Sequence, residues 1–194
     1  GVGLNNNVVA SYRTATKIIT DPMSSRINIL SLPGQRDSFI TDFAAEKTKE
    51  HGKAIYLMDI PSYASDDSSV VTRLFDDSTL TPSVRETAET FDGRQFDNNF
   101  SATYFPDVVI EDNVNNRMVT VPASIPALGA IAFNDSVSYP WFAPAGFNRG
   151  SLGFVSNIKT RLTAGDRDTL YEARINPIAN FPRGGFVIFG QKTL

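Results

Sequence analysis

The chain has no cysteine and one histidine, His51, among its 194 residues. The absence of cysteine excludes disulfides and thiolate metal sites, and it fits a protein made in a reducing compartment. With one histidine, any catalytic triad must use His51, and a metal site with two histidines is excluded. His51 lies in the last turn of a predicted helix, where it more simply complements the helix dipole. Serine hydrolase and zinc enzyme chemistry are therefore not expected.

Long apolar runs and a strong net charge are also missing. The composition, with 41% hydrophobic and 20% charged residues, is typical of a soluble globular protein. No apolar run approaches the roughly 20 residues of a membrane span, and no export signal is visible at the start. The net charge of -3 argues against nucleic-acid binding. We expect one globular domain over residues 1–194, and because the first residue is not Met, a fragment of a longer protein.

Charge is unevenly distributed along the chain. Residues 1–146 carry 11 Lys and Arg against 18 Asp and Glu, whereas residues 147–194 carry 7 against 3. Parts of opposite sign can attract copies of the same chain head to tail, although a solvated mosaic surface is the more ordinary interpretation.

Phosphate-binding and metal-binding patterns are weak. Gly52-Lys53 has Lys47 where the Walker motif requires glycine, and it ends a predicted helix instead of opening one. The better candidate is "PGQRDS" at residues 33–38, which follows a predicted strand and places Arg36 at the edge where α/β folds bind anions. Any strand-to-helix turn needs the same residue types. No cofactor, metal ligand or catalytic residue is therefore assigned.

Acidic residues gather after the second predicted strand without a recognisable site. The loop contains Asp66, Asp67, Asp76 and Asp77 but lacks the spacing of glycine and glutamate of a calcium loop, so a solvated loop is expected. Asp59 ends the strand, a position where catalytic carboxylates occur, yet no paired acid or base is visible in the sequence.

Hydrophobic periodicity predicts an α/β fold. A helix over "VVASYRTATKII" precedes a strand in "RINILSLPG", a helix capped by Asp37 and stopped by Gly52, and a strand in "KAIYLMDIP". Strand, helix and strand within about 30 residues indicate a right-handed βαβ unit with parallel strands. The acidic stretch that follows is expected to be a loop with a short helical piece.

Later segments extend the same pattern. Helices are predicted from Thr81-Pro82-Ser83 to about Phe91, over "PASIPALGAIAFND" and over "TAGDRDTLYEARI". A turn is expected at "DNVNNRM". Because Pro106 cannot donate a hydrogen bond, "SATYFPDVVI" is predicted to be an edge strand or a bulged strand. The segment "GGFVIFG" has apolar residues on both faces and is predicted to be a central parallel strand. The expected fold is an α/β sandwich in three layers, with a mainly parallel sheet flanked by helices.

An aromatic loop at residues 139–150, "YPWFAPAGFNRG", stands out. It could cradle a ligand or act as a rigid plug between packed surfaces. Its prolines limit the freedom of the unfolded chain, and its aromatics can bury a large area. We expect a rigid brace with Trp141 anchored in the core, the alternatives being an ordinary core-covering loop or an exposed Trp141 with an interface role.

Several ordered motifs resemble the tail sheath proteins of contractile bacteriophages and related contractile injection systems. They are "INILSLPG…HGKAIYLMDIP", "SATYFPDVVI", "VPASIPALGAIA", "APAGFNRG" and "INPIANFPRGGFVIFGQKTL". Together they span roughly residues 25–194, and ordered agreement is more specific than any single motif. Asp107 departs from the pattern, since the family has Trp after Tyr-Phe-Pro, and the acidic residues around 65–80 are peculiar to this chain.

The resemblance implies a subtilisin-like core without a protease triad, hence no enzyme activity. It implies a structural subunit that assembles with its own copies around a tail tube, contacts the baseplate, and contracts to drive the tube through the host envelope. It places the protein in the virion, after synthesis in the host bacterial cytoplasm. The family's C-terminal region, which contacts the tube and links neighbours by strand exchange, would begin where residue 194 ends, so we expect the isolated chain to be monomeric.

Two other classes remain as alternatives. One is an α/β enzyme or nucleotide-binding module that uses the loops from Pro33 to Ser38 and from Pro61 to Asp67, which would require a deep pocket with converging polar groups. The other is a carbohydrate-binding or receptor-binding decoration of the virion, which would require an exposed aromatic platform.

Overall fold

The computed structural model describes residues 3–64 and 81–194. The helices are η1 (Gly3–Asn5), α1 (Asn7–Ile19), α2 (Ser38–His51), α3 (Val84–Asp92), α4 (Ser124–Val137), α5 (Gly146–Arg149) and α6 (Ala164–Glu172). The strands are β1 (Ile29–Ser31), β2 (Ile55–Met58), β3 (Ser101–Phe105), β4 (Val108–Asp112), β5 (Arg117–Val121), β6 (Val155–Ile158), β7 (Ile175–Phe181) and β8 (Gly185–Ile188). The expected helical piece within the acidic stretch, and Asp66, Asp67, Asp76 and Asp77, lie outside the described residues.

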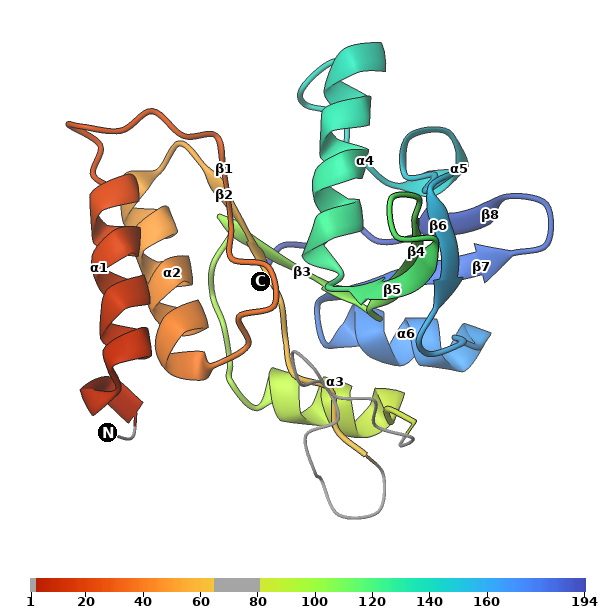
Figure 1. Ribbon diagram of the computed structural model, residues 1–194, viewed down its shortest axis with the longest axis horizontal. Helices are drawn as coiled ribbons and strands as arrows, with labels where there is room; N and C mark the ends of the chain where they lie inside the picture. Colours follow the sequence, from red (N-terminus) through yellow and green to blue (C-terminus); the bar gives the residue numbers. More distant parts are fainter. Residues whose placement is uncertain (1–2, 65–80) are drawn as a thin grey trace.

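Two sheets organise these strands (Figure 1). The larger has the order β1-β2-β3-β7-β8, and its first four strands pair in parallel, whereas β8 pairs antiparallel with β7 at the edge. The smaller sheet has the order β5-β4-β6 and is antiparallel. The parallel pairing of β1 with β2 confirms the predicted βαβ unit, and the mainly parallel sheet with flanking helices confirms the α/β class.

Strand alternation places a hydrophobic core on each face of the larger sheet. In β2, Tyr56 and Met58 belong to a core shared with α2, α3 and α6, whereas Leu57 belongs to a core shared with α4 and the smaller sheet. Successive side chains of a strand point to opposite faces, so one short strand contributes to both cores. The molecule therefore has three layers, with α2, α3 and α6 on one side and α4 with the smaller sheet on the other.

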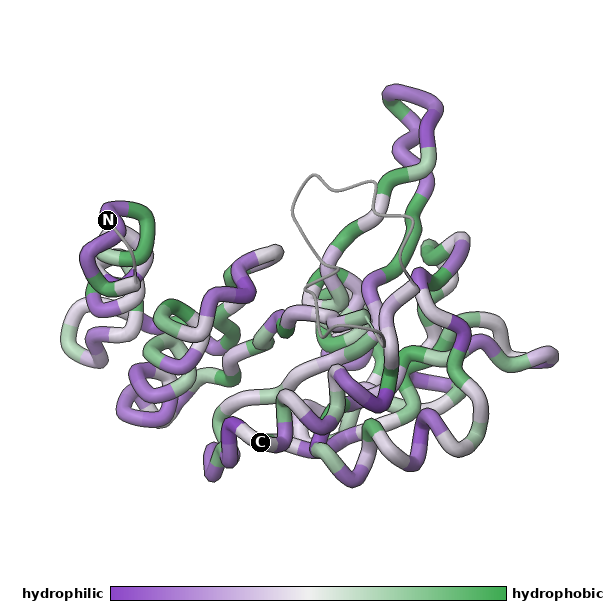
Figure 2. Tube along the Cα trace, turned by 90° about the horizontal axis from the view of Figure 1, so that it is seen from below, coloured by the Kyte–Doolittle hydropathy of each residue, from purple (hydrophilic) through white to green (hydrophobic). Residues whose placement is uncertain are grey.

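Helix α1 lies outside this sandwich. It contacts α2 and forms one end of the molecule, marked by the N-terminus in Figure 2. The side facing α2 includes the buried Val9 and Thr16. Arg13 strengthens the contact, because its Nη1 donates to the carbonyl oxygen of Phe39 at 2.8 Å.

The boundaries of α2 follow the predicted capping residues, and two further helices have caps that the structure reveals. Asp37 accepts a hydrogen bond from the backbone N–H of Phe39, and Gly52 ends α2 with φ of 71°, a left-handed conformation that glycine adopts without a Cβ clash. Ser83 caps α3, and Thr163 forms a capping box with Asp166 at the start of α6. Within residues 3–64 and 81–194 the predicted helices form, because their local signals coincide with an apolar face that packs on the sheet or, for α1, on α2.

The predictions for two strands need correction. For "SATYFPDVVI" the edge-strand alternative was wrong, because Pro106 follows β3, the central strand of the larger sheet, and separates it from β4 in the smaller sheet. Pro is tolerated there because it falls between two strands and removes no donor from either ladder. The bulge alternative agrees with β4, whose pairing with β6 shifts register between Val109 and Ile110. The "GGFVIFG" segment forms β8, an antiparallel edge strand instead of a central parallel one. Its outer side is covered near Val187 by a bridge to Ser151, which explains its apolar composition.

Candidate functional site

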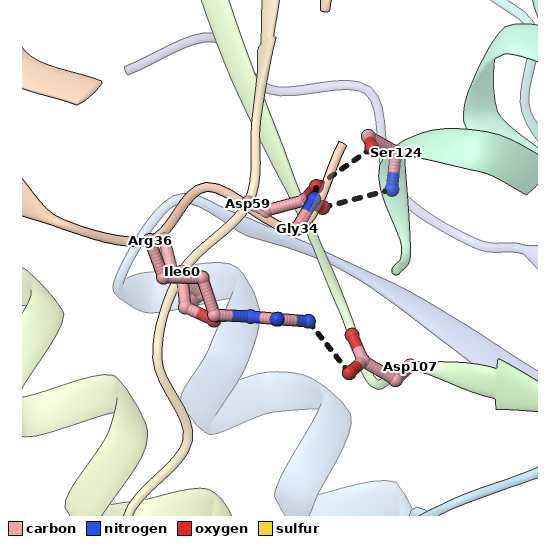
Figure 3. A network of polar contacts seen from close by, with 6 residues as sticks. All are labelled: Gly34, Arg36, Asp59, Ile60, Asp107 and Ser124. Carbon is pink, nitrogen blue, oxygen red and sulfur yellow. Dashed lines mark hydrogen bonds and ion pairs between the residues drawn. The ribbon is translucent and has the colours of Figure 1, made fainter. Parts of the chain in front are cut away.

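A buried carboxylate lies where the larger sheet meets α4. Asp59 follows β2 and is 2% exposed. It accepts hydrogen bonds from the backbone N–H of Gly34 at 2.9 Å, from the backbone N–H of Ser124 at 3.0 Å and from the Ser124 hydroxyl at 2.8 Å (Figure 3). The carboxylate therefore joins the loop after β1 to the first residue of α4, across the carboxyl ends of the parallel strands.

Arg36 extends this network to the smaller sheet. Its Nε donates to the carbonyl oxygen of Ile60 at 3.0 Å, and its Nη2 lies 2.7 Å from Oδ2 of Asp107 (Figure 3). Asp107 occupies the connection between β3 and β4. Gly34, Arg36, Asp59, Asp107 and Ser124 together are called the polar clasp below. It connects the ends of β1, β2 and β3 to α4 and β4.

Burial sets the electrostatics of the clasp. Desolvation raises the pKa of Asp59, while hydrogen bonds from Gly34 and Ser124 and the charge of Arg36 act in the opposite direction. Desolvation likewise raises the pKa of Asp107, and the Asp59 charge adds to that effect although Arg36 opposes it. Both pKa values are raised mainly because burial disfavours the charged carboxylate, and the charge of Arg36 offsets only part of that effect.

The clasp contains two of the residues that the sequence analysis considered as site candidates, Arg36 and Asp59. Arg36, proposed as an anion contact, is engaged by the Ile60 carbonyl and the Asp107 carboxylate. Asp59, which had no visible partner in the sequence, contacts Ser124 from 65 residues away. The second carboxylate, Asp107, was noted only as a departure from the family pattern. Its pairing with Arg36, 71 residues distant, has no local signal in the sequence.

An open pocket of about 450 Å³ lies beside the clasp, where the enzyme alternative predicted one. The loops after the first two strands line it, through Arg36, Asp37 and Ser38 and through Ile60, Pro61 and Tyr63, together with part of α3 and Arg94. Its volume falls in the range of small-molecule sites. However, Arg36 points to Asp107, and Arg94 binds Asp42 and the hydroxyl of Thr41. Both cations are committed to protein carboxylates.

His51 is buried at the end of α2, and its Nδ1 lies 3.0 Å from the carbonyl oxygen of Thr20. The ring therefore joins the ends of α1 and α2. In the described part of the chain, no group of three or more His, Asp or Glu side chains is arranged to hold a metal ion. Among the helices of residues 3–64 and 81–194, none has the length and apolarity needed to cross a membrane.

The aromatic loop corrects the expectation that Trp141 is anchored in the core. Trp141 is 75% exposed and Tyr139 is 60% exposed, and their rings stack with centroids 4.7 Å apart and an interplanar angle of 5°. Phe142 adds a third partly exposed ring, 6.1 Å from Tyr139. The cores are already filled from the sheets and helices, so the loop carries its rings outward.

The backbone of this loop is nevertheless held in place. The buried Asn134 donates from Nδ2 to the carbonyl oxygen of Phe142 at 2.9 Å. Gly150 closes the loop, and a Cβ there would lie 2.8 Å from the Ile188 carbonyl oxygen and from the Ala145 Cα. The predicted rigidity therefore has a structural basis, although the aromatic rings do not supply it.

The proteins that this chain is similar to are tail sheath proteins of contractile bacteriophages. It is 43% identical over 82 residues to the tail sheath protein of Vibrio phage KVP40, covering 42% of this chain and 12% of that protein. It is 34% identical over 110 residues to the tail sheath protein of Enterobacteria phage T4, covering 52% and 16%. The tail sheath protein of Salmonella phage ViI is 28% identical over 96 residues, covering 48% and 15%. No protein-family model matches.

Solved structures share the fold. The anti-feeding prophage helical sheath in the contracted state has a TM-score of 0.56 at 19% identity, covering 98% of this chain and 44% of that one. The sheath complex of an extracellular contractile injection system, PVC, in the contracted state has a TM-score of 0.60 at 19% identity, covering 96% and 49%. The chain thus spans about half the length of these structures and much less of the phage relatives. The resemblance inferred from the ordered motifs is confirmed.

Proposed function

We propose that this chain is the core of a structural subunit of a contractile tail sheath, which assembles around a tail tube and contracts to drive the tube through a host envelope. The observation that carries the proposal is the similarity to tail sheath proteins of three phages. The shared fold with contracted sheaths agrees with it. Work would come from the difference in subunit packing between an extended and a contracted state, without nucleotide consumption.

The proposal includes a subtilisin-like core with no enzyme activity. In support, the polar groups that a catalyst would use here hold the fold together. Asp59 binds two backbone N–H groups and a hydroxyl, Arg36 binds a carbonyl and a carboxylate, and His51 joins two helices. A subunit that moves as a rigid body needs such connections between its layers.

The proposed partners are other copies of the sheath protein, the tail tube and the baseplate, and the proposed location is the contractile tail of the virion, after synthesis in the host cytoplasm. The solved relatives include a prophage baseplate and two assembled sheaths, which supports this set. The rest of a longer protein would contact the tube and link neighbours. By itself, the described core would then remain monomeric.

Electron microscopy of the full-length protein tests the proposal. Purified protein should form hollow tubes of uniform diameter, since relatives are found in helical sheaths. A parallel assay with peptide and ester substrates should show no turnover above that of a His51→Ala variant. Particles that never form tubes, with or without co-expressed tube protein, would overturn the sheath assignment.

A further inference from the structure

Helix α1 is attached to the rest of the molecule through few buried groups. Of its 13 residues, Val9 and Thr16 are buried, whereas the 14 residues of α2 include seven buried ones. A helix of this length is marginally stable by itself, so its stability in a protein comes mainly from the packing of an apolar face. One buried valine and one buried threonine supply little of that packing. Other contacts therefore hold α1 in place.

Arg13 and Lys17 make the central contacts of α1 with α2. The Arg13 Nη1 donates to the carbonyl oxygen of Phe39 at 2.8 Å, and the Arg13 guanidinium carbon lies 3.9 Å from the centroid of the Phe43 ring. The Lys17 Nζ lies 5.8 Å from the same centroid. Phe43 is 7% exposed, so α1 and its two cations cover this ring.

Two hydrogen-bonding contacts flank this centre. The Gln35 Nε2 donates to the hydroxyl oxygen of Tyr12 at 3.1 Å, and the His51 Nδ1 lies 3.0 Å from the carbonyl oxygen of Thr20, directly after α1. A single contact of this kind contributes modestly to stability, because water competes for the same groups. Helix α1 is thus docked by several weak contacts that form together.

Helix α2 has its own attachment to the sandwich. Ala44 and Ala45 belong to the core that lies against the larger sheet. The Asn98 Nδ2 donates to the carbonyl oxygen of Ala45 at 2.8 Å, and the Arg94 Nη2 donates to the hydroxyl of Thr41 at 2.8 Å. These contacts do not involve α1, so α2 stays in place when α1 leaves.

The connection from α1 to β1 allows such a movement. Residues 21–28 form neither a helix nor a strand, and Met23 is 93% exposed. Asp21 accepts hydrogen bonds from the backbone N–H of Met23 and from the hydroxyl of Ser24, so these bonds remain within the turn. Figure 1 shows the connection as a loop that leaves the end of α1, and Figure 2 shows α1 as the outermost helix at its end of the molecule.

We propose that α1 is a strap that detaches from α2 as a unit while the three-layered sandwich stays folded. Local openings of this kind lie below the free energy of global unfolding. Detachment uncovers Phe43 and the part of α2 around it, including Phe39 and Lys47, whose Nζ lies 5.7 Å from the Phe43 centroid. The strap therefore covers a surface that the closed chain does not present. The inference goes beyond the proposed function, because it concerns the chain itself and holds whether or not the chain assembles.

Native-state hydrogen exchange measured by NMR tests the strap. Protection factors in residues 9–16 of α1 should be at least about tenfold lower than those in residues 40–48 of α2, and similar to one another along α1. Exchange in α1 should also depend less steeply on urea, because its opening exposes less surface. Equal protection with equal urea dependence in both helices would overturn the proposal. A gradient of protection from the ends of α1 would indicate fraying and would overturn it as well.

An arginine variant tests the contacts that hold the strap. Arg13→Met keeps an apolar stem and removes the guanidinium, so it should lower the protection of α1 about threefold or more and leave that of α2 unchanged. The matched control is Arg161→Met, which removes an exposed cation between β6 and α6 and should change neither helix. An equal loss in both helices, or no loss in α1, contradicts the proposal.

A covalent lock separates detachment from other causes of fast exchange. The Nζ atoms of Lys17 and Lys47 lie 5.8 Å and 5.7 Å from the same ring centroid, and the chain has no cysteine of its own. Lys17→Cys combined with Lys47→Cys and bridged by a short bis-maleimide should raise the protection of α1 toward that of α2. The same double variant without the bridge should keep the low protection. Fast exchange in the bridged form would mean that α1 loses its helical structure without leaving α2, and the strap would be refuted.

Discussion

The polar clasp and the rings of Tyr139, Trp141 and Phe142, called the aromatic patch here, reverse the usual distribution of residues between the interior and the surface. In the clasp, the carboxylate of Asp59 is buried, and the paired side chains of Arg36 and Asp107 are only 10% and 17% exposed. In the patch, a stacked tryptophan and tyrosine are exposed to solvent. Buried charges are costly unless paired, and a large exposed aromatic surface is rare on a monomer. Each therefore needs a reason, and the two reasons differ.

The comparison separates what holds the subunit together from what it presents to others. The clasp links the ends of strands in the larger sheet to α4 and to the smaller sheet. It therefore holds the layers of the sandwich together. The patch contributes little to holding them together, because Trp141 and Tyr139 are mostly exposed and stack on each other, while Phe142 lies beside the guanidinium of Arg149. The proposed role as a sheath subunit would need both properties: an interior that does not deform and surfaces that can exchange neighbours.

The largest expected effect comes from removing the centre of the clasp. Asp59→Ala leaves two buried N–H groups and the Ser124 hydroxyl without their acceptor and leaves Arg36 with one carboxylate fewer nearby. We expect the free energy of unfolding to fall by about 3–5 kcal/mol, as for other broken buried ionic networks. Urea denaturation followed by circular dichroism measures it.

The matched control for this substitution is Glu46→Ala, which removes an exposed acid from the surface of α2. Surface changes of this kind alter stability by about 0.5 kcal/mol or less. Equal midpoints for Asp59→Ala and Glu46→Ala would show that the clasp does not stabilise the sandwich.

A double-mutant cycle isolates the Arg36–Asp107 pair. The single variants Arg36→Met and Asp107→Asn and their combination should give a coupling of about 1–3 kcal/mol, because the pair is 2.7 Å apart and largely buried. The exposed pair of Arg85 and Glu89 on α3 is the comparison, and its coupling should be about 0.3–0.5 kcal/mol. Coupling of the same size in both pairs would contradict the role assigned to burial.

Protonation of Asp59 should change the free energy of unfolding less than the substitutions above, and only over a limited range of pH. Since burial raises the pKa of Asp59, the folded protein keeps its proton at pH values where the unfolded chain has lost it. The contribution of Asp59 to stability therefore declines as the pH rises from the ordinary aspartate pKa through the raised value. The exposed Asp21 is the reference, because hydrogen bonds from Met23 and Ser24 lower its pKa.

Carbon NMR of the side-chain carboxyls distinguishes the two groups directly. The Asp59 signal should titrate at a higher pH than the Asp21 signal. An Asp59 midpoint at or below that of Asp21 would mean that its hydrogen bonds outweigh its desolvation.

The sequence was sufficient wherever neighbouring residues determine the structure. Helix α2 begins after Asp37, whose side chain accepts a hydrogen bond from the first turn. It ends at Gly52, which adopts the left-handed conformation that closes the helix. The sequence was insufficient where the outcome depends on distant pairing. Pro106 lies between strands of different sheets, and β8 is an edge strand whose outer side another segment covers. The residue types of these segments predict neither the position of Pro106 between two sheets nor the edge position of β8.

The candidate site shows the same limit. Asp59 could be singled out from its position after β2. Its contact with Ser124 depends on how α4 packs, and the contact of Asp107 with Arg36 depends on where β4 begins. The aromatic loop was misassigned for a related reason. Aromatic composition predicts burial on average, and whether a ring enters the core depends on the space that the rest of the fold leaves.

The smallest expected effect on stability therefore belongs to the residue that the sequence placed in the core. Trp141 is 75% exposed and makes its ring contact with Tyr139, itself exposed. A stacked aromatic pair contributes about 0.5–1.5 kcal/mol, and exposure keeps this pair near the lower end of that range. Trp141→Ala should thus lower the free energy of unfolding by less than about 1 kcal/mol, far below the 3–5 kcal/mol of a buried tryptophan. Thermal unfolding measures the change, with Trp141→Phe as the control that keeps a stacking ring. A loss as large as that of Asp59→Ala would mean that Trp141 packs against the protein in solution.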